Sequence, residues 1–489
     1  MPIDFSRIDQ MVSQLRYVRS GDIVLSLDHN LQNDAIKELA DLLKSHPRPP
    51  AMIIAASDTP ETLKQKADYI CDGVSDQVEI NEALTKSSTV VLCDGTYQID
   101  DAIVVPDNSC IIGLANATIR TSRNESFNFV RVIGKSNVKI CGIRFHLPFK
   151  PSEGVYIYAI YIENSTNVIV EGCEFTGFFE TGVFVIGKGG WCRDVRVVRN
   201  RFDGTNGDIY FENCINIIAS ENVSYNCDYY SIFLWTSSGV ISKNLFRDCG
   251  AGIGVYSYVD EWFEGQLVVI SDNVIVSSLS FAIDVYCLPA IVISNNCVSV
   301  KPGEYSLSVI CVYDVELSVI SGNCVDGGGS ASHGIYVDYW DVATAHCYVM
   351  QNVVRNVSHN GVFGWLRNIN VTGNVIYRCG CDGIALNTLD GVISSNVVHT
   401  TSQEENNRWS SIYVVYSENL VIEGNRCYVG DEANKPKYGI YIDSTCQYVM
   451  VHGNNLYQSG VTGDLYIASG TNTKARDNIG NNGEWLPDI

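Results

Sequence analysis

The amino-acid sequence predicts an all-β protein folded as a right-handed, single-stranded parallel β-helix, with a short α-helical segment at its N-terminus. Three observations favour this fold class. A short phrase ending in asparagine recurs at steps of 22 to 29 residues between positions 200 and 478. A short strand with alternating apolar side chains follows each of these asparagines. Long runs of helix-forming residues are missing from the array, which argues against helical repeats of similar period.

The recurrent asparagine holds a fixed position in each repeat. A sharp bend between two strands favours a residue that tolerates the left-handed backbone region, and asparagine does so. Equal bends stacked about 4.8 Å apart let side-chain amides bond along the column. A ligand-binding role is the alternative. The expected ladder comprises Asn200, Asn222, Asn244, Asn273, Asn296, Asn323, Asn352, Asn374, Asn396, Asn425, Asn454 and Asn478.

The chain divides into three parts. Residues 1–50 include LQNDAIKELADLLKSH, whose leucines recur at helical spacing, and they are predicted to form a helical attachment segment. Residues 51–88 are interpreted as a linker and an N-terminal capping helix. Residues 89–489 are predicted to form the β-helix, because strand phrases such as GDIYFE and YGIYID repeat throughout them.

Composition narrows the classes of partner and compartment. The formal charge of −22 repels phosphate backbones, so nucleic acid is not expected as a partner. No run of 18 apolar residues exists, so no membrane span is expected. The first residues lack the apolar stretch of a signal peptide. The 18 cysteines are spread through strands and turns, which favours buried free thiols over a disulfide framework, although a few disulfides would also fit.

The stretch ADYICDGVSDQVEINEAL, followed by VVLCDGTYQIDDAIVVPDNSCIIGLANATIR, resembles the start of pectate-lyase-like β-helix proteins. The resemblance covers roughly residues 55–480 and implies a short helix over Asp76–Leu84 that plugs the open end of the solenoid. Similar phrases occur in archaeal surface proteins and in phage and archaeal-virus tailspikes. Residues 16–43 also look like the N-terminal attachment segments of viral tail proteins.

One outer face of the predicted solenoid carries rings and carboxylates. Taking the apolar positions of each strand phrase as inward, period two makes the alternate residues outward. Rings can stack on sugars while carboxylates accept hydroxyl hydrogen bonds. Contact between subunits of a homotrimer is the alternative use of this face. The candidate carbohydrate-binding residues are Trp235, Tyr256, Tyr286, Trp262 and Trp365.

Two sets of residues on this face are catalytic candidates. Glu212, Asp284 and Asp338 alternate with the rings, and a carboxylate pair can hydrolyse glycosidic bonds. His333 and Tyr336 precede Asp338, an arrangement loosely similar to the Tyr/Asp/His group of alginate epimerases and lyases. The Asp-Pro-His signature of those enzymes and a basic partner are both missing. A histidine satisfied at a turn is the alternative for His333. No cofactor is expected, although clustered aspartates would also suit calcium.

These features favour a virion tailspike or fibre, or a surface protein, that binds and in some cases degrades host-surface polysaccharide. The expected partners are a host-surface glycan, two further copies in a homotrimer, and a virion tail or baseplate protein through residues 1–50. The expected location is extracellular or on a virion. The alternatives are a secreted polysaccharide lyase, hydrolase or epimerase, and a purely structural surface or filament protein.

Overall fold

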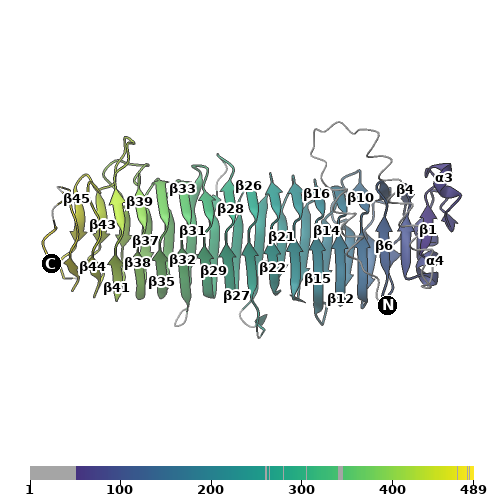
Figure 1. The fold of residues 1–489 in the computed structure, drawn as a ribbon, viewed down its shortest axis with the longest axis horizontal. Coiled ribbons are helices and arrows are strands. Elements are labelled where there is room, and N and C mark those ends of the chain that lie inside the picture. The colour runs from purple at the N-terminus through teal and green to yellow at the C-terminus, as the bar shows by residue number, and fades with distance from the viewer. Residues whose placement is uncertain are drawn as a thin grey trace.

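The computed structural model describes residues 51–488, apart from 259–260, 264, 279, 304–305, 340–344, 471, 482 and 484. The attachment segment predicted over residues 1–50 therefore lies outside the described residues. The described chain winds into one elongated solenoid of stacked strands (Figure 1). The fold is the expected right-handed parallel β-helix, with about 14 turns.

Each turn of the solenoid contributes up to three short strands, as in β14 (Thr181–Ile186), β15 (Cys192–Val198) and β16 (Arg201–Asp203). Each pairs in parallel with its counterpart in the next turn. Strands equivalent to β14 and β15 belong to a 32-stranded sheet, and those equivalent to β16 form a 14-stranded sheet. We call the outer surfaces over these three series the first, second and third faces.

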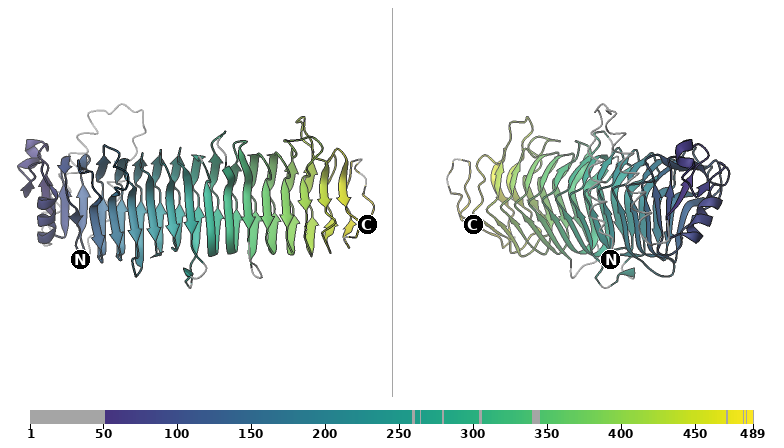
Figure 2. Two further views of the ribbon diagram at one scale, coloured as in Figure 1. Left: turned by 180° about the vertical axis from the view of Figure 1, so that it is seen from behind. Right: turned by 45° about the vertical axis from the view of Figure 1, so that its right-hand side comes forward.

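The N-terminal end of the solenoid is closed by a helix. Helix α4 (Gln77–Lys86) lies across this end, where the sequence places a helix over Asp76–Leu84 (Figure 2). The first turn has no preceding turn to cover its apolar core, so the apolar side of α4 packs against that core and is buried. Strand β1 (Met52–Ala55) pairs with β2 (Tyr69–Ile70) and β3 (Thr89–Leu92), so the sheet begins upstream of residue 89. The buried apolar residues of α4 are Ile80, Ala83 and Leu84.

The core is a continuous column of apolar side chains along the solenoid axis. Stacked rings fill part of it, with ring centroids 5.2 Å apart between Phe145 and Phe175 and 4.7 Å apart between Phe175 and Phe202. Leu465 in the last turn is only partly buried. The other positions expected to point inward are buried: Val183, Ile209, Ile232, Ile253, Ile283, Ile335, Val362, Ile384, Ile412 and Ile440.

The twelve asparagines between positions 200 and 478 are all buried and form one hydrogen-bonded column. Asn374 is typical. Its backbone N–H and its Nδ2 both donate to Oδ1 of Asn396, at 2.9 Å, while Nδ2 also donates to the Val349 carbonyl. Its own Oδ1 accepts the equivalent pair from Asn352. The amides thus satisfy polar backbone groups that the bend leaves inside the solenoid.

The expected backbone role of these asparagines is wrong. The left-handed residue is the one before each asparagine, as at Arg199 (φ 58°), Glu221 (φ 57°) and Lys243 (φ 58°). The left-handed residue turns the chain, while the following asparagine directs its amide to the buried backbone groups. Because it needs no specific side chain, this preceding position holds charged and small residues alike, including Asp272, Gly322 and Ser395.

The cysteines are free thiols, as the sequence predicts. None of the 18 cysteines forms a disulfide, and most are buried. Only Cys297 and Cys324 are exposed, and they are direct neighbours in adjacent turns of the third face. In the described part of the chain, no helix is long and apolar enough to cross a membrane.

Two aspartates are buried inside the solenoid. Asp208 is 1% exposed and accepts a hydrogen bond from the Thr205 hydroxyl. Asp382 is 4% exposed and accepts the backbone N–H of Ser410 at 2.7 Å. Burial raises the pKa of each carboxyl to about 7, because the charged form loses its hydration.

The asparagine column predicts a large cost for Asn374→Leu. The leucine removes the acceptor for two donors of Asn352 and leaves the Val349 carbonyl without this donor. Each unsatisfied buried group costs about 1–3 kcal/mol, so we expect a loss of about 3–5 kcal/mol in urea unfolding. Asn370→Leu is the control, because Asn370 points outward four residues upstream on β35 (Asn368–Thr372). Equal urea midpoints for Asn374→Leu and Asn370→Leu would contradict a stabilising role for the asparagine column.

The buried aspartates predict that stability falls as pH rises. A carboxyl with a raised folded-state pKa stabilises the fold fully below its unfolded pKa of about 4, and this contribution is lost as pH rises through about 7. Each group contributes up to about 4 kcal/mol over this window. Thermal unfolding at pH 5 and pH 8 measures the effect, and Asp208→Asn should reduce the difference. If the melting temperature of Asp208→Asn changed between pH 5 and pH 8 by as much as that of the unsubstituted protein, this assignment would be contradicted.

Candidate carbohydrate-binding face

The first face presents two outward columns, set by the parallel register of its strands. These strands include β17 (Gly207–Glu212), β21 (Tyr230–Trp235), β24 (Ala251–Tyr256), β27 (Ile283–Ser294) and β31 (Ala331–Asp338). We call this surface the ring face. The first column runs Tyr161, Phe184, Tyr210, Phe233, Gly254, Asp284, Cys311, Tyr336 and Phe363, and the second runs Glu163, Ile186, Glu212, Trp235, Tyr256, Tyr286, Tyr313, Asp338 and Trp365.

Cys311 and Tyr313 were not recognised as part of this face. Both lie on β29 (Ser306–Ser321), whose sequence SLSVICVYDV has Val309 where the recognised strand phrases have glycine, alanine, serine or aspartate before the inward residue. Cys311 lies between two buried residues of the core, Ile310 and Val312. It is therefore outward, directly beside Asp284 in the register.

Most rings of this face stack on one another rather than standing free. Phe184 and Tyr210 are 4.8 Å apart between centroids with an interplanar angle of 3°. Tyr286 and Tyr313 are 5.3 Å apart at 5°, and a similar stack joins Tyr336 to Phe363. Faces covered in this way by the next turn are not available to a sugar. These stacks stabilise the solenoid and present mainly ring edges to solvent.

The stacking is interrupted around Tyr256. Its ring is tilted by 53° from Trp235 and by 61° from Tyr286. The interruption follows from Gly254, because a Cβ there would lie 2.8 Å from Cε1 of Tyr230. The ring of Tyr230 uses this space, and with Phe233 and Ala251 it forms a small hydrophobic cluster separate from the main core.

Loop residues extend this cluster outward. Tyr258 is 49% exposed and meets Trp235 edge to face, with centroids 5.2 Å apart. Tyr229 is also exposed and packs edge to face on Tyr230. Both were missed because they lie outside the repeated strand phrase. We call the set Tyr229, Tyr230, Phe233, Trp235, Tyr256, Tyr258 and Tyr286 the aromatic cluster.

Asp284 lies within the aromatic cluster. Its Oδ2 accepts hydrogen bonds from the hydroxyls of Tyr230, at 3.0 Å, and Tyr256. It is only 8% exposed, so the expectation of an open polar contact is wrong for this residue. Burial raises the pKa of Asp284, and the hydrogen bonds from Tyr256 and Tyr230 oppose that rise. The result is a shielded carboxyl whose proton is held more tightly than usual.

The other two acidic candidates are each paired with a tyrosine in their own strand. Oε2 of Glu212 accepts the Tyr210 hydroxyl at 3.1 Å, and Oδ2 of Asp338 accepts the Tyr336 hydroxyl at 2.7 Å. The register separates Asp284 from Asp338 by two turns, or about 10 Å along the axis. Glu212 lies three turns from Asp284, or about 14 Å.

His333 does not join a proton relay with Tyr336. Its ring packs near Tyr336 and Phe363, with centroids 5.4 and 5.2 Å away. Its buried Nδ1 has no hydrogen-bond partner in the described structure, so the alternative of a satisfied turn histidine is also wrong. Burial lowers the pKa of His333 to about 4, with a further contribution from His359. His333 is therefore neutral at physiological pH.

The two remaining tryptophan candidates lie apart from the aromatic cluster's centre. Trp262 is in the loop after β24, and its Nε1 donates to the Cys287 carbonyl at 3.0 Å, so it is anchored there. Trp365 ends β34 (Val362–Trp365) beside Asp338 in the second column and is 55% exposed.

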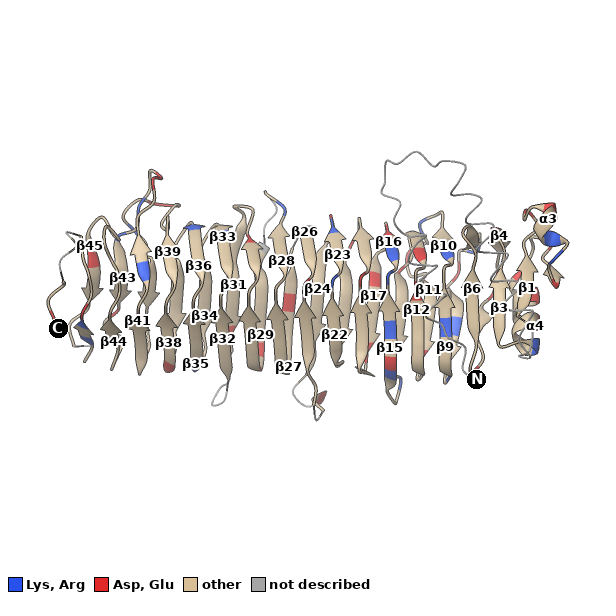
Figure 3. Ribbon diagram, in the orientation of Figure 1, with Lys and Arg blue, Asp and Glu red and all other residues tan. Residues whose placement is uncertain are grey.

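The central and C-terminal parts of the ring face carry charge of one sign, whereas at its N-terminal end Arg131 of β8 (Phe127–Ile133) lies beside Tyr161. Among the described strands of this series, those from β11 (Ile157–Glu163) to β45 (Gly463–Ile467) contain no lysine or arginine. In Figure 3 the central part of this face carries acidic residues only. Such a surface disfavours uronates and other anionic sugars, whose carboxylates need a positive partner.

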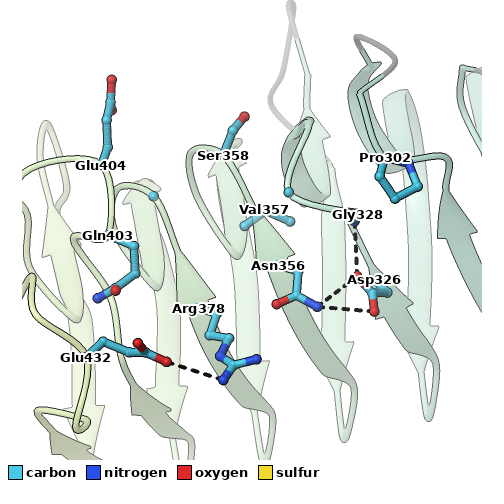
Figure 4. Close-up of a pocket in the computed structure, with 12 residues that line it drawn as sticks. Pro302, Asp326, Gly328, Asn356, Val357, Ser358, Arg378, Gln403, Glu404 and Glu432 are labelled. Carbon is cyan, nitrogen blue, oxygen red and sulfur yellow. Dashed lines mark hydrogen bonds and ion pairs between the residues drawn. The ribbon is translucent and has the colours of Figure 1, made fainter.

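A polar groove lies on another side of the solenoid, with a volume of about 770 Å³ (Figure 4). It spans the turns that follow the third-face strands. Its charged groups are paired with neighbours: Arg378 contacts Glu432 at 3.2 Å, and Asp326 accepts from Asn356 at 3.1 Å. Sequence reasoning missed it, because its residues come from several turns with no shared motif.

Calcium held by clustered aspartates is the metal site that the sequence would allow. Among the described residues, one group of three potential metal ligands was found, comprising Cys71, Asp76 and Glu79. It lies at the N-terminal end beside α4, not on the ring face. Asp284 and Asp338 accept hydrogen bonds from tyrosines.

Comparison with known proteins agrees with this architecture. Residues 128–298 match a family model described as a right-handed β-helix region, in agreement with the fold of the described residues. No curated protein sequence matches the chain. The similar solved structures include phage tailspike proteins.

The tailspike protein of E. coli bacteriophage HK620 was solved in complex with pentasaccharide. It is 13% identical, with a TM-score of 0.56 over 96% of this chain and 87% of that chain. A mutant of it in complex with hexasaccharide gives a TM-score of 0.57 over 96% and 86% of the two chains, at 13% identity. Tailspike protein 3 of bacteriophage CBA120 is 14% identical, with a TM-score of 0.45, and the match covers 84% of this chain but 59% of that one. At these identities the likeness shows the fold.

The aromatic cluster predicts a specific effect of Gly254→Ala. The added Cβ would lie 2.7 Å from Cδ2 of Phe233 and 2.8 Å from Cε1 of Tyr230, so both rings must move. We expect weaker near-UV circular dichroism and a loss of about 1–3 kcal/mol in stability. Gly190→Ala is the control, because its nearest neighbour would be 3.4 Å away. An unchanged near-UV spectrum for Gly254→Ala would refute the packing of Tyr230 over Gly254.

Proposed function

We propose that this chain is a virion tailspike or fibre, or a related surface protein, that binds host-surface polysaccharide through the aromatic cluster. The observation that supports this proposal most directly is that seven rings gather outside the solenoid core around the shielded carboxyl of Asp284. Clusters that combine apolar faces with convergent hydroxyls and a carboxylate suit sugar rings. The fold shared with saccharide-bound tailspikes supports the same assignment. Assembly as a homotrimer, and attachment to a tail or baseplate through residues 1–50, belong to this proposal.

The charge of the ring face favours a polysaccharide of neutral or amino sugars. With no basic side chain in the described first-face strands from β11 to β45, the face around the aromatic cluster offers no counter-charge for a uronate. This argues against a uronate lyase or epimerase, which must stabilise negative charge at the sugar carboxylate. The absence of a hydrogen bond between His333 and Tyr336 points in the same direction.

Cleavage of the bound chain is a second step of the proposal. Asp284 has the raised pKa that a general acid needs, and Asp338 is the acidic residue nearest to it in register on the second column. Their positions differ by two turns, about 10 Å along the axis, and by one column, about 7 Å across the face. This exceeds the separation of about 6.5–9.5 Å typical of inverting glycosidases, so the two side chains have to lean toward each other to act on one bond. Of the two, only Asp284 is deeply buried, so it is the acid and Asp338 the base.

The binding test compares single ring deletions by isothermal titration with the host's own polysaccharide. Trp235→Ala and Tyr286→Ala should each weaken binding by roughly 1 kcal/mol, or about fivefold. Tyr466→Ala is the matched control, since Tyr466 and Tyr286 have the same exposure, 39%. Equal losses in all three variants, or none, would refute the aromatic cluster as the binding site. An oligomer that dissociates in Trp235→Ala while retaining glycan affinity would instead assign the cluster to a subunit contact.

The cleavage test uses Asp284→Asn in a reducing-end assay. The amide preserves shape and removes the ionisable group, so turnover should fall at least 100-fold while affinity is retained. Glu163→Gln is the control, since Glu163 is another carboxylate of the ring face that accepts a tyrosine hydroxyl, from Tyr161, and it lies five turns from Asp284. Full activity in Asp284→Asn would refute Asp284 as the acid, and no release of reducing ends by the unsubstituted protein would leave a binding function only.

A further inference from the structure

Two cysteines of the third face present their thiols to solvent. Of the 18 cysteines in the chain, Cys297 and Cys324 are exposed, and the others are buried or half-buried. Cys297 begins β28 (Cys297–Val300), and Cys324 begins β30 (Cys324–Asp326). The parallel register places the two residues directly opposite each other in consecutive turns. Both side chains therefore leave the solenoid on the same side.

The separation of these two residues suits a covalent link. Neighbouring strands lie about 4.8 Å apart, and disulfides join residues whose Cα atoms are about 4.4–6.8 Å apart. Burial, the charge of Cys324 and a hydrogen bond with the Cys324 thiol raise the pKa of Cys297, so the two sulfur atoms are already in contact. The two turns need not move apart or slide for a bond to form between them.

A second pair of cysteines shows what exposure adds to register. In the described strand ladders, Cys192 and Cys214 are also directly opposite each other, on β15 and β18 (Cys214–Ile215). Both are completely buried, at 0% exposure. A reagent in solution cannot reach them in the folded protein, so they act as small core residues. The pair formed by Cys297 and Cys324 has the same register and is open to solution.

The exposed pair lies at an irregular point of the third-face sheet. The pairing of β26 (Val274–Ser278) with β28 shifts register between Ile275 and Ser278, and β28 then pairs with β30 at three positions. The chain beyond these strands leads to one edge of the polar groove, which Pro302 and Asp326 line (Figure 4). A covalent link between β28 and β30 would therefore fix two turns where the sheet is least regular.

We infer that Cys297 and Cys324 form a reversible intramolecular disulfide when the protein meets a small-molecule disulfide such as oxidised glutathione. One cysteine thiolate attacks a sulfur atom of the small disulfide, which gives a mixed disulfide and releases the first small thiol. The other cysteine, as its thiolate, attacks the protein sulfur of the mixed disulfide and releases the second small thiol. The two cysteines lose two electrons and two protons in total, and the small disulfide gains both.

The surroundings of the protein would set the state of this pair. Thiols persist in a reducing cytosol, and disulfides persist outside it. An exposed disulfide is also easier to reduce than a buried structural one, so the link should open again under reducing conditions. Because the two cysteines are 27 residues apart in the sequence, the disulfide closes a loop and restricts the unfolded chain. The oxidised protein is therefore the more stable form.

Thiol counting and melting of the full-length protein test this link. After reduction with dithiothreitol and desalting, treatment with oxidised glutathione at pH 8 should remove two of the 18 free thiols. Peptide mapping should join Cys297 to Cys324 within one chain, and the melting temperature should rise by at least about 2 °C. Dithiothreitol should reverse both changes. Eighteen remaining thiols, a link between two copies of the chain, or an unchanged melting temperature would overturn the proposal.

Three variants separate this pair from the other thiols. Cys297→Ser removes the second thiol, so Cys324 should keep one bound glutathione and the melting temperature should not rise. Cys297→Val combined with Val353→Cys moves the pair by one turn, since Val353 lies opposite Cys324, and should again lose two thiols.

Cys110→Ser is the control, because Cys110 and Cys141 are half-buried thiols that also contact each other. This variant should still form the link between Cys297 and Cys324. Loss of two thiols in Cys297→Ser, or loss of none in Cys110→Ser, would contradict the assignment. These measurements involve no glycan, so their outcome is independent of the proposed function.

Discussion

The whole molecule depends on hydrogen bonds to the buried backbone N–H and C=O groups at the corner between the second and third faces. The bend from the second to the third face leaves amide and carbonyl groups inside an apolar core, where each would be costly without a partner. The asparagine column supplies those partners turn after turn, as at Asn374, whose amide bonds to Asn396 and to the Val349 carbonyl. Because the column tolerates no insertion, it also fixes the register of all three faces.

That fixed register explains why the rings of the ring face stack in columns and where the stacking breaks. Side chains at equivalent positions lie about 4.8 Å apart, which is close enough for rings to stack on each other by default. A column of rings is therefore first a structural device, and Phe184 with Tyr210 shows it. A site arises where the column is broken. At Gly254 and Asp284 the rings of Tyr230 and Tyr256 turn aside and direct their hydroxyls to one carboxylate.

The same register separates the surfaces by chemistry. The ring face around the aromatic cluster is acidic and aromatic, whereas the second-face strands β19 (Ile217–Ser220), β22 (Gly239–Ser242) and β25 (Val268–Ser271) present valine, isoleucine and serine outward. Length variation is confined to the corners that flank the first face. Those corners supply Tyr229 and Tyr258 to the aromatic cluster.

The fold could be predicted from sequence because period-two alternation and a fixed asparagine spacing determine which residues point inward. The outward columns followed for the same reason, including Trp235, Tyr256 and Tyr286 as neighbours. What could not be predicted depends on side-chain direction: the stacking that hides most ring faces, and the burial of Asp284 under Tyr230. Cys311 and Tyr313 were missed because their turn lacks the usual phrase, and the left-handed residue was assigned one position too late because glycine, serine and charged residues share that position.

A crystal structure of the protein soaked with a neutral oligosaccharide from a host-surface polysaccharide tests the central claim most directly. The account predicts sugar density against Trp235 and Tyr286, with a hydroxyl or glycosidic oxygen within hydrogen-bond distance of the Asp284 side chain. Density in the polar groove beside Asp326 and Arg378, with the aromatic cluster empty, would contradict it.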